Sequence, residues 1–145
     1  MTLFFVVIAN KDDLPAIQLI EESKKTGIYM LLRDDNKRYV GRASNSIFSR
    51  LQQHNTNKPW WNKLIFFGHE SGRLSEAQLD LLERLIIEKM KTANIDLDNN
   101  TQGNKSYIDK LSKFSSLSLL SKVEKLMNDI VNIDLFDSFL DECRK

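Results

Sequence analysis

The sequence predicts an α+β fold. Three short apolar runs with strand-type patterning lie near residues 27–32, 38–42 and 64–67, each bounded by polar turn residues. Two longer segments, 47–54 and 75–91, carry apolar residues at helical spacing. Three strands flanked by helices indicate one sheet packed against helices. With 145 residues, 41% of them hydrophobic and 28% charged, the chain suits a single domain spanning residues 1–145 with a sizeable core.

The N-terminal region predicts an extra strand and an extra helix. Residues 3–9 are apolar but short, and no Lys or Arg precedes them as in a signal peptide, so we expect a buried strand. Leu14, Ile17 and Ile20 then recur at helical spacing behind two aspartates that can cap a helix, which predicts a helix over residues 14–25. No stretch has the length that crosses a bilayer, so we expect no membrane partner.

Two tripeptides lie ten residues apart on the predicted hairpin, Gly27-Ile28-Tyr29 on its first strand and Tyr39-Val40-Gly41 on its second. The polar turn 33–37 joins the two strands. This arrangement places Tyr29 and Tyr39 on neighbouring strands. A tyrosine beside a glycine is by itself an ordinary packing feature, so the pair gains weight only with the residues that follow.

The helix after the hairpin contains two side chains of chemical interest. Ser and Asn residues at 44–46 can cap it, and we expect it to end near His54, before Pro59. Arg50 and His54 are four residues apart and share one face. An arginine suits phosphate oxygens, and a histidine can take a proton near neutral pH. A surface arginine and a helix-end histidine are the ordinary alternatives.

Glu83 lies within the most strongly patterned helix, 75–91, which opens with the capping box Ser75-Glu76-Ala77-Gln78. Its neighbours at helical spacing are apolar: Leu79, Ile86, Ile87 and Met90. A divalent cation would explain a carboxylate there, because Mg²⁺ is held by one or two carboxylates; pairing with an arginine is the alternative. Four charged residues at four-residue steps predict a separate solvated row: Glu76, Asp80, Arg84 and Glu88.

The last third of the chain predicts a loop and more helix. Residues 94–106 are rich in Asn, Asp and Gly, which predicts a long loop. Apolar residues from Leu119 to Ile130 repeat with helical period, and a second apolar cluster follows at Leu135, Phe136, Phe139 and Leu140.

Charge and cysteine content narrow the function classes. The single cysteine, Cys143, excludes an intrachain disulfide and a thiolate zinc site, which fits a reducing cytoplasm. The net charge of +1 is low for a protein that binds nucleic acid. However, residues 26–65 hold seven basic and two acidic side chains, leaving +5, and residues 66–100 hold four basic and seven acidic, leaving −3. This pattern suits a metal-dependent phosphate site, with ordinary solvated charge as the alternative.

Taken together, the polar residues form an ordered set: Tyr29, Tyr39, Arg50, His54, Glu83 and Asn99. In this order and with the two tripeptides, the chain resembles the GIY-YIG nuclease family over roughly residues 26–107. Val40 stands where the family has isoleucine, a β-branched change of similar volume. Asn99 is chosen for its Leu97-Asp98-Asn99 context, and Asn94, Asn100 and Asn104 remain competitors. We expect residues 108–145 to form a C-terminal helical extension.

The resemblance implies a small three-stranded antiparallel sheet flanked by helices, with the N-terminal strand and helix and the C-terminal helices as additions. It implies that Tyr29 and His54 activate a water and that Tyr39 and Arg50 bind the phosphate. Glu83 would ligate a cation, and Asn99 would support the site.

The implied activity is metal-dependent DNA cleavage with Mg²⁺ (or Mn²⁺), of the repair, restriction or mobile-element type. The expected partner is DNA. No recognition module is apparent in the sequence, so a homodimer and a separate recognition subunit are both open. Two other interpretations also stay open: a domain of this fold that binds nucleic acid or protein without turnover, and an unrelated α+β adaptor.

Overall fold

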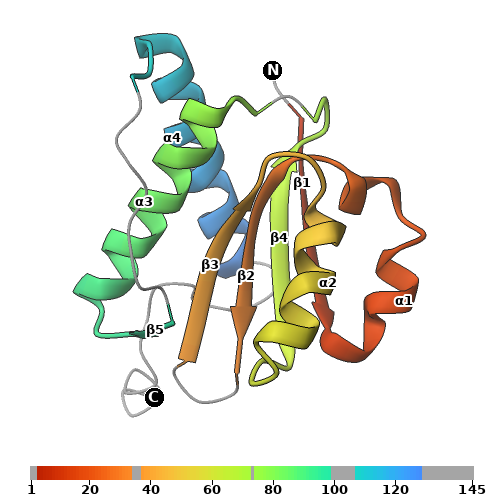
Figure 1. Cartoon of the computed structure of the whole chain (residues 1–145). Helices are drawn as coiled ribbons and strands as arrows, with labels where there is room; N and C mark the ends of the chain where they lie inside the picture. The colour runs from red at the N-terminus through yellow and green to blue at the C-terminus, as the bar shows by residue number, and fades with distance from the viewer. Residues whose placement is uncertain (1–2, 34–36, 73, 99–106, 129–145) are drawn as a thin grey trace.

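The computed structural model describes residues 3–33, 37–72, 74–98 and 107–128. In this part of the chain, one five-stranded mixed sheet packs between helices, which confirms the α+β class (Figure 1). The strands are β1 (Phe4–Asn10), β2 (Gly27–Leu32), β3 (Lys37–Ala43), β4 (Lys63–His69) and β5 (Asp96–Leu97). Their order across the sheet is β1-β4-β2-β3-β5.

The centre of the sheet is the predicted three-stranded antiparallel unit. Strands β2 and β3 form the hairpin, and β4 pairs antiparallel with β2. Five of the six residues of β2 are buried, because a strand in the middle of the sheet is covered on both faces. The expected long loop contains β5, which adds two residues parallel to β3.

The N-terminal strand β1 is confirmed as a strand, but its expected burial is wrong. It pairs antiparallel with β4 at the edge of the sheet. Only Phe5 is buried, and Ile8 is exposed. An edge strand has one neighbouring strand instead of two. Its apolar sequence alone therefore does not show how deeply the strand is buried.

The predicted helix over residues 14–25 is wrong. The chain forms a 3-10 turn at Lys11–Asp13, a single helical turn α1 at Leu14–Ile17, and another 3-10 turn at Glu21–Lys24. Ile20 between them has extended backbone angles. The Ser23 hydroxyl donates a hydrogen bond of 2.9 Å to the Ile20 carbonyl, which satisfies a group that a continuous helix would have bonded.

Of the three remaining helices in the described ranges, two begin at their predicted caps, and the third begins earlier than predicted. Helix α2 (Ile47–Asn57) begins at the N-cap Ser46, and α3 (Glu76–Thr92) begins at Ser75 with the capping box formed. Helix α4 spans Lys110–Leu126, so it begins nine residues before Leu119, where the apolar repeat that predicted it starts. The second apolar cluster at 135–140 lies outside the described residues. None of the described helices is long and apolar enough to span a membrane.

The sheet separates two hydrophobic clusters, one on each face. On one face, α1 and α2 cover Tyr29, Leu31 and Phe66. On the other face, α3 and α4 cover Met30, Ile65 and other side chains of the same strands. Figure 1 shows α2 in front of the sheet and α4 behind it. The alternation follows from strand geometry, because neighbouring residues of a strand point to opposite faces.

Candidate active site

The two motif tyrosines lie together on the α2 face of the sheet. Tyr29 on β2 is directly opposite Gly41 on β3, and Tyr39 is two residues away on the same strand. Residues two apart share a face, so the rings become diagonal neighbours, with centroids 6.2 Å apart. Tyr29 is fully buried, and Tyr39 is half-buried.

Gly41 is needed because the Tyr29 side chain occupies the space of a Cβ. A Cβ built at Gly41 would collide with the hydroxyl and ring of Tyr29. Gly27 is equally constrained, because its Cβ would collide with the Phe67 carbonyl oxygen of β4. The glycines of both tripeptides therefore allow the close packing that seats Tyr29.

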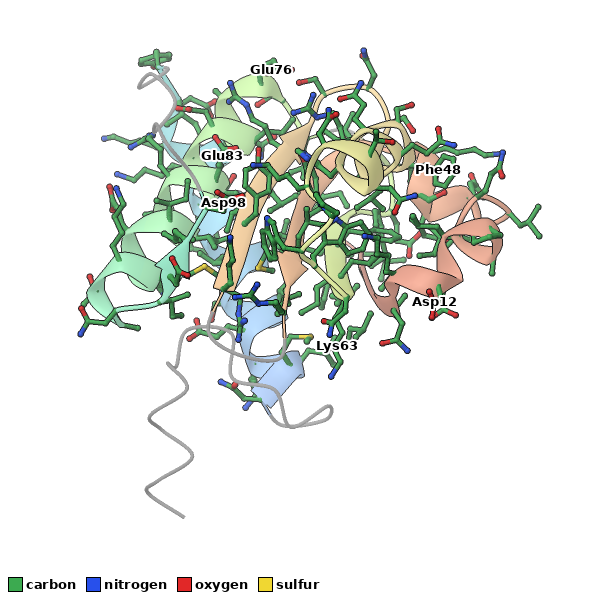
Figure 2. All side chains as sticks on the ribbon, turned by 60° about the horizontal axis from the view of Figure 1, so that its bottom comes forward. Asp12, Phe48, Lys63, Glu76, Glu83 and Asp98 are labelled. Atoms are coloured by element: carbon green, nitrogen blue, oxygen red, sulfur yellow. The ribbon has the colours of Figure 1, made fainter. Side chains whose placement is uncertain are left out.

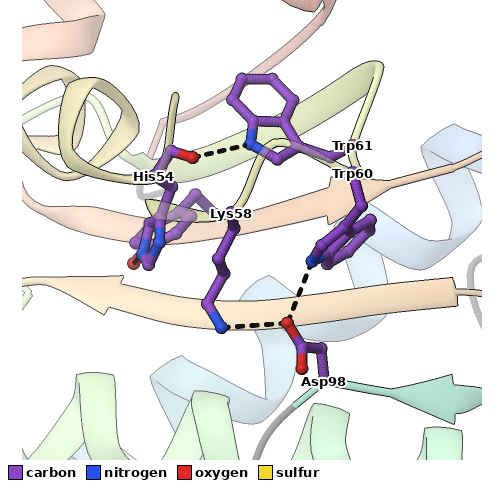
Figure 3. A network of polar contacts seen from close by, with 6 residues as sticks. His54, Lys58, Trp60, Trp61 and Asp98 are labelled. Atoms are coloured by element: carbon purple, nitrogen blue, oxygen red, sulfur yellow. Dashed lines mark hydrogen bonds and ion pairs between the residues drawn. The ribbon is translucent and has the colours of Figure 1, made fainter. Parts of the chain in front are cut away.

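His54 in the last turns of α2 contacts both tyrosines. Its Nε2 lies 2.7 Å from the Tyr29 hydroxyl, and its ring centroid is 4.9 Å from that of Tyr39. Its backbone carbonyl accepts a hydrogen bond of 3.2 Å from the Trp61 indole, which ties the end of α2 to the chain before β4 (Figure 3). Burial, together with the positive charges of Arg50 and Lys58, lowers the pKa of His54 to about 4.

The Tyr29–His54 pair is therefore neutral at neutral pH. Burial is the largest cause that raises the pKa of Tyr29 above its ordinary value, with Tyr39 adding to it, so the phenol keeps its proton. A protonated phenol donates to the unprotonated Nε2 of a neutral imidazole, which places the imidazole proton on Nδ1. That Nδ1 is buried and has no hydrogen-bond partner among the described residues.

An open cavity of about 520 Å³ lies beside these rings. Tyr39 and Arg42 of β3, Arg50 of α2 and Glu83 of α3 line it, together with small polar side chains from residues 44–49. Three separate elements thus contribute a phenol, two guanidinium groups and one carboxylate to one cavity.

Arg50 reaches the cavity from the face of α2 that also carries His54. Its guanidinium acts electrostatically on the hydroxyls of Tyr29 and Tyr39. One guanidinium nitrogen donates to the Gln53 side chain at 3.0 Å, while Nε is buried without a partner among the described residues. The shared face of Arg50 and His54 expected from their spacing is the face that meets the tyrosines.

Glu83 lies on α3 on the side of β3 (Figure 2), where it is half-buried and lines the cavity. Burial raises the pKa of this carboxyl, opposed by the positive charge of Arg42, and Asp80 raises it further. No group of three His, Cys, Asp or Glu side chains with metal-binding geometry occurs in the described ranges. A single hard oxygen donor beside an open cavity fits a largely hydrated Mg²⁺ ion and not a closed metal cage.

The predicted exposure of Asp80 is wrong. It was expected in a solvated charge row, but only 1% of its surface is exposed. Its two carboxylate oxygens lie 3.5 Å from Arg42 and 3.2 Å from Arg84. The pairing with Arg84 has the same spacing as a surface pair, so no sequence signal marked its burial. The buried carboxylate holds Arg42 of β3 at the cavity wall.

A second polar network borders the site at β5 (Figure 3). One carboxylate oxygen of Asp98 accepts hydrogen bonds from Lys58 at 2.9 Å and from the Trp60 indole at 3.0 Å. Partial burial opposes them, yet these bonds lower the pKa of the Asp98 carboxyl. The Lys58 ammonium also lies 4.7 Å from the centre of the Tyr39 ring. Asn99, the next residue, lies outside the described residues.

A second buried histidine, His69, lies apart from the candidate site. It is the last residue of β4 and only 8% exposed, next to α4. Burial lowers its pKa. It does not line the cavity that Tyr39, Arg50 and Glu83 share.

The family model of the GIY-YIG catalytic domain matches residues 25–94 of the chain. These residues form a GIY-YIG domain. The GIY-YIG domain holds Tyr29, Tyr39, Arg50, His54 and Glu83, whereas Asp98 and Asn99 follow it. A GIY-YIG catalytic domain indicates a nuclease-type function. Comparison with curated proteins and with solved structures gave no match.

Proposed function

We propose that the protein is a metal-dependent endonuclease that hydrolyses DNA phosphodiester bonds, of the repair, restriction or mobile-element type. The observation that carries the proposal is the cavity in which Tyr39, Arg42, Arg50 and Glu83 meet beside the Tyr29–His54 hydrogen bond. Phosphodiester hydrolysis needs an activated water, cations against the phosphate oxygens and help for the leaving alkoxide. The cavity brings together side chains that suit each of these needs.

The Tyr29–His54 pair accepts the proton of the attacking water. The water oxygen forms a bond to phosphorus while its proton moves to the Tyr29 oxygen, and the Tyr29 proton moves to Nε2 of His54. The bond from phosphorus to the leaving oxygen breaks in the same displacement. Because Tyr29 is fully buried, substrate binding has to shift Tyr39 or Arg50, the cavity residues that act on its hydroxyl, to admit the water.

Arg50 and Arg42 neutralise the charge that builds on the phosphate. Both guanidinium groups line the cavity, and a guanidinium keeps its charge throughout the pH range of a protein. Asp80 fixes Arg42 in place, so little side-chain freedom is lost when phosphate binds. The Tyr39 hydroxyl donates a further hydrogen bond to a phosphate oxygen.

Glu83 would hold a Mg²⁺ or Mn²⁺ ion, with water and substrate phosphate as the other ligands. Such an ion supplies Lewis-acid stabilisation of the phosphate and of the leaving oxygen. Burial raises the pKa of the Glu83 carboxyl, and the positive charges of Arg42 and Arg50 oppose this shift by favouring the ionised carboxylate that this role requires.

A plasmid cleavage assay with matched variants tests the proposal. The purified protein is incubated with supercoiled plasmid, with and without Mg²⁺ or Mn²⁺. We expect nicking or linearisation that requires the metal, and a loss of at least about 100-fold in Glu83→Ala, because an interaction with the transition state is removed. Glu88→Ala is the control, since Glu88 is an exposed carboxylate on the same helix.

Three outcomes would count against the proposal. Cleavage retained by Glu83→Ala would remove Glu83 from the site. Equal losses in Glu83→Ala and Glu88→Ala would point to general destabilisation of α3. Binding of DNA without cleavage under any of these metal conditions would favour a binding module built on the same fold.

A further inference from the structure

Helix α4 carries two apolar faces, and only one of them is covered. Its buried side chains, among them Leu119, Leu120 and Val123, pack into the cluster under α3. A second apolar row is exposed instead: Leu111 is 81% exposed, Phe114 72% and Leu117 43%. Residues three apart lie on the same side of a helix, so these three form one stripe on the side away from the core.

Lysines border the exposed stripe. Lys110 is four residues before Phe114, Lys113 is four residues before Leu117, and both are exposed. Over residues 107–128 there are four lysines and two acidic residues, a balance of +2. We call the side formed by Lys110, Leu111, Lys113, Phe114 and Leu117 the outer face of α4. A contiguous exposed apolar patch of this kind marks an interaction surface.

The sequence that follows α4 has the complementary character. Residues 129–145 hold five acidic and two basic side chains, a balance of −3. Their apolar residues Leu135, Phe136, Phe139 and Leu140 have the spacing of an amphipathic helix. An acidic and apolar segment is what a basic and apolar face would bind.

The length of this segment also suits the outer face. Seventeen residues extend beyond Asn128, and as a helix they would reach about 25 Å at 1.5 Å per residue. Helix α4 also has 17 residues, and a turn of a few residues joins two antiparallel helices. A segment that returns along α4 as a helix can therefore bring Leu140 near the level of Leu117 and the residues that follow it toward Phe114.

We propose that residues 129–145 dock in cis on the outer face of α4. A second copy of the chain is a poorer occupant, because a two-fold interface would bring together two outer faces that both carry Lys110 and Lys113. A tethered segment also acts at a high effective concentration, which a free partner does not. The docked segment lies on the sheet face opposite α2 and leaves the cavity with Arg50 and Glu83 open.

The native cysteine allows a direct test. Cys143 is the only cysteine of residues 1–145, so a nitroxide label attached to it reports where the segment 129–145 lies. In ¹⁵N-labelled protein we expect the amide signals of residues 111–117 to lose most of their intensity. Those of α2, on the other face of the sheet, should keep theirs. In a mixture of ¹⁵N-labelled protein without a spin label and unlabelled (¹⁴N) protein with a spin label, the α4 signals should stay intact.

Two variants sharpen the test. Phe114→Asp places a negative charge in the stripe and should restore the α4 signals, and it removes no core packing because Phe114 is exposed. Leu19→Asp changes an equally exposed apolar residue before β2 and should leave the intensity loss unchanged. Intact α4 signals in the spin-labelled wild type would overturn the proposal. A loss that appears in the mixed sample would assign the outer face to a second copy.

Discussion

At the scale of single residues, burial sets the chemistry of His54. The imidazole lies under the tyrosines with 7% of its surface exposed, and two cations stand near it. Both conditions disfavour the charged form, so the ring is neutral and its Nε2 can accept the hydrogen bond of the Tyr29 hydroxyl. An exposed histidine at the end of a helix would be partly charged near pH 6.5 and would not hold this hydrogen bond to Tyr29 in one form.

The lowered pKa of His54 predicts how stability depends on pH. The unfolded chain binds a proton on this histidine below about pH 6.5, whereas the folded protein binds it only near pH 4. Between these values the unfolded state holds more protons, so the free energy of unfolding falls as pH decreases. We expect His54→Gln to show a shallower fall between pH 6.5 and 4 in urea unfolding followed by circular dichroism.

His69 also has a lowered pKa, but it is present in both proteins, so the difference between the two curves isolates His54. Parallel curves for wild type and His54→Gln over this range would contradict the prediction.

At the scale of elements, α3 contributes both to the stability of the fold and to the candidate site. The capping box at Ser75 and Gln78 starts the helix, and the helix then presents Asp80 to two arginines and Glu83 to the cavity. The two carboxylates are three residues apart, so they occupy neighbouring positions on one side. One is bound by protein cations, and the other remains available to the cavity.

Asp80→Asn should destabilise the protein strongly. The substitution keeps the shape but removes the charge that pairs with Arg42 and Arg84, and breaking a buried ion pair costs about 3 kcal/mol or more. Chemical denaturation measures this loss, with Glu88→Gln as the exposed control on the same helix, expected to change stability by less than about 0.5 kcal/mol. Equal stability of Asp80→Asn and wild type would show that the buried pairs make no net contribution.

At the scale of the whole molecule, the distribution of charge matters more than its sum. The net charge is +1, yet two arginines and Lys58 gather at the cavity and the ring of Tyr39. Polyanions respond to local fields, because each neutralised phosphate releases counterions. A protein with almost no net charge can therefore bind DNA through one face.

The salt dependence of DNA binding tests whether the positive charges at the cavity contact phosphate. Under the proposed function, Arg50→Gln should weaken binding of a duplex and reduce the slope of log K against log salt by about 1, since one phosphate contact is lost. Fluorescence anisotropy in metal-free buffer measures the slope without cleavage. Lys113→Gln removes the same charge from α4, on the other side of the sheet, and should leave the slope unchanged. An unchanged slope in Arg50→Gln would remove that residue from the interface.

Much of the fold was predictable because it depends on short-range physics. The β2–β3 hairpin, the Ser46 and Ser75 caps and the length of α3 follow from turn residues, capping side chains and apolar spacing within a few positions. The meeting of Tyr29, Tyr39, Arg50, His54 and Glu83 was expected from the order of these residues, through the family resemblance. Spacing alone yielded only that Arg50 and His54 share one face.

The sequence by itself determined the α+β class, the central antiparallel strands and the capped helices, and it named Tyr39, Arg50 and Glu83, but not Arg42, among the residues that line the cavity. Only the tertiary structure decided that the helix expected after Leu14 breaks at Ile20, that Asp80 is buried, and that Asp98 binds Lys58 and Trp60. Burial and charge pairing depend on partners from distant parts of the chain, up to 40 residues away for Lys58 and Asp98. Local propensity carries no record of such partners, because their interaction exists only once the sheet and helices have packed together.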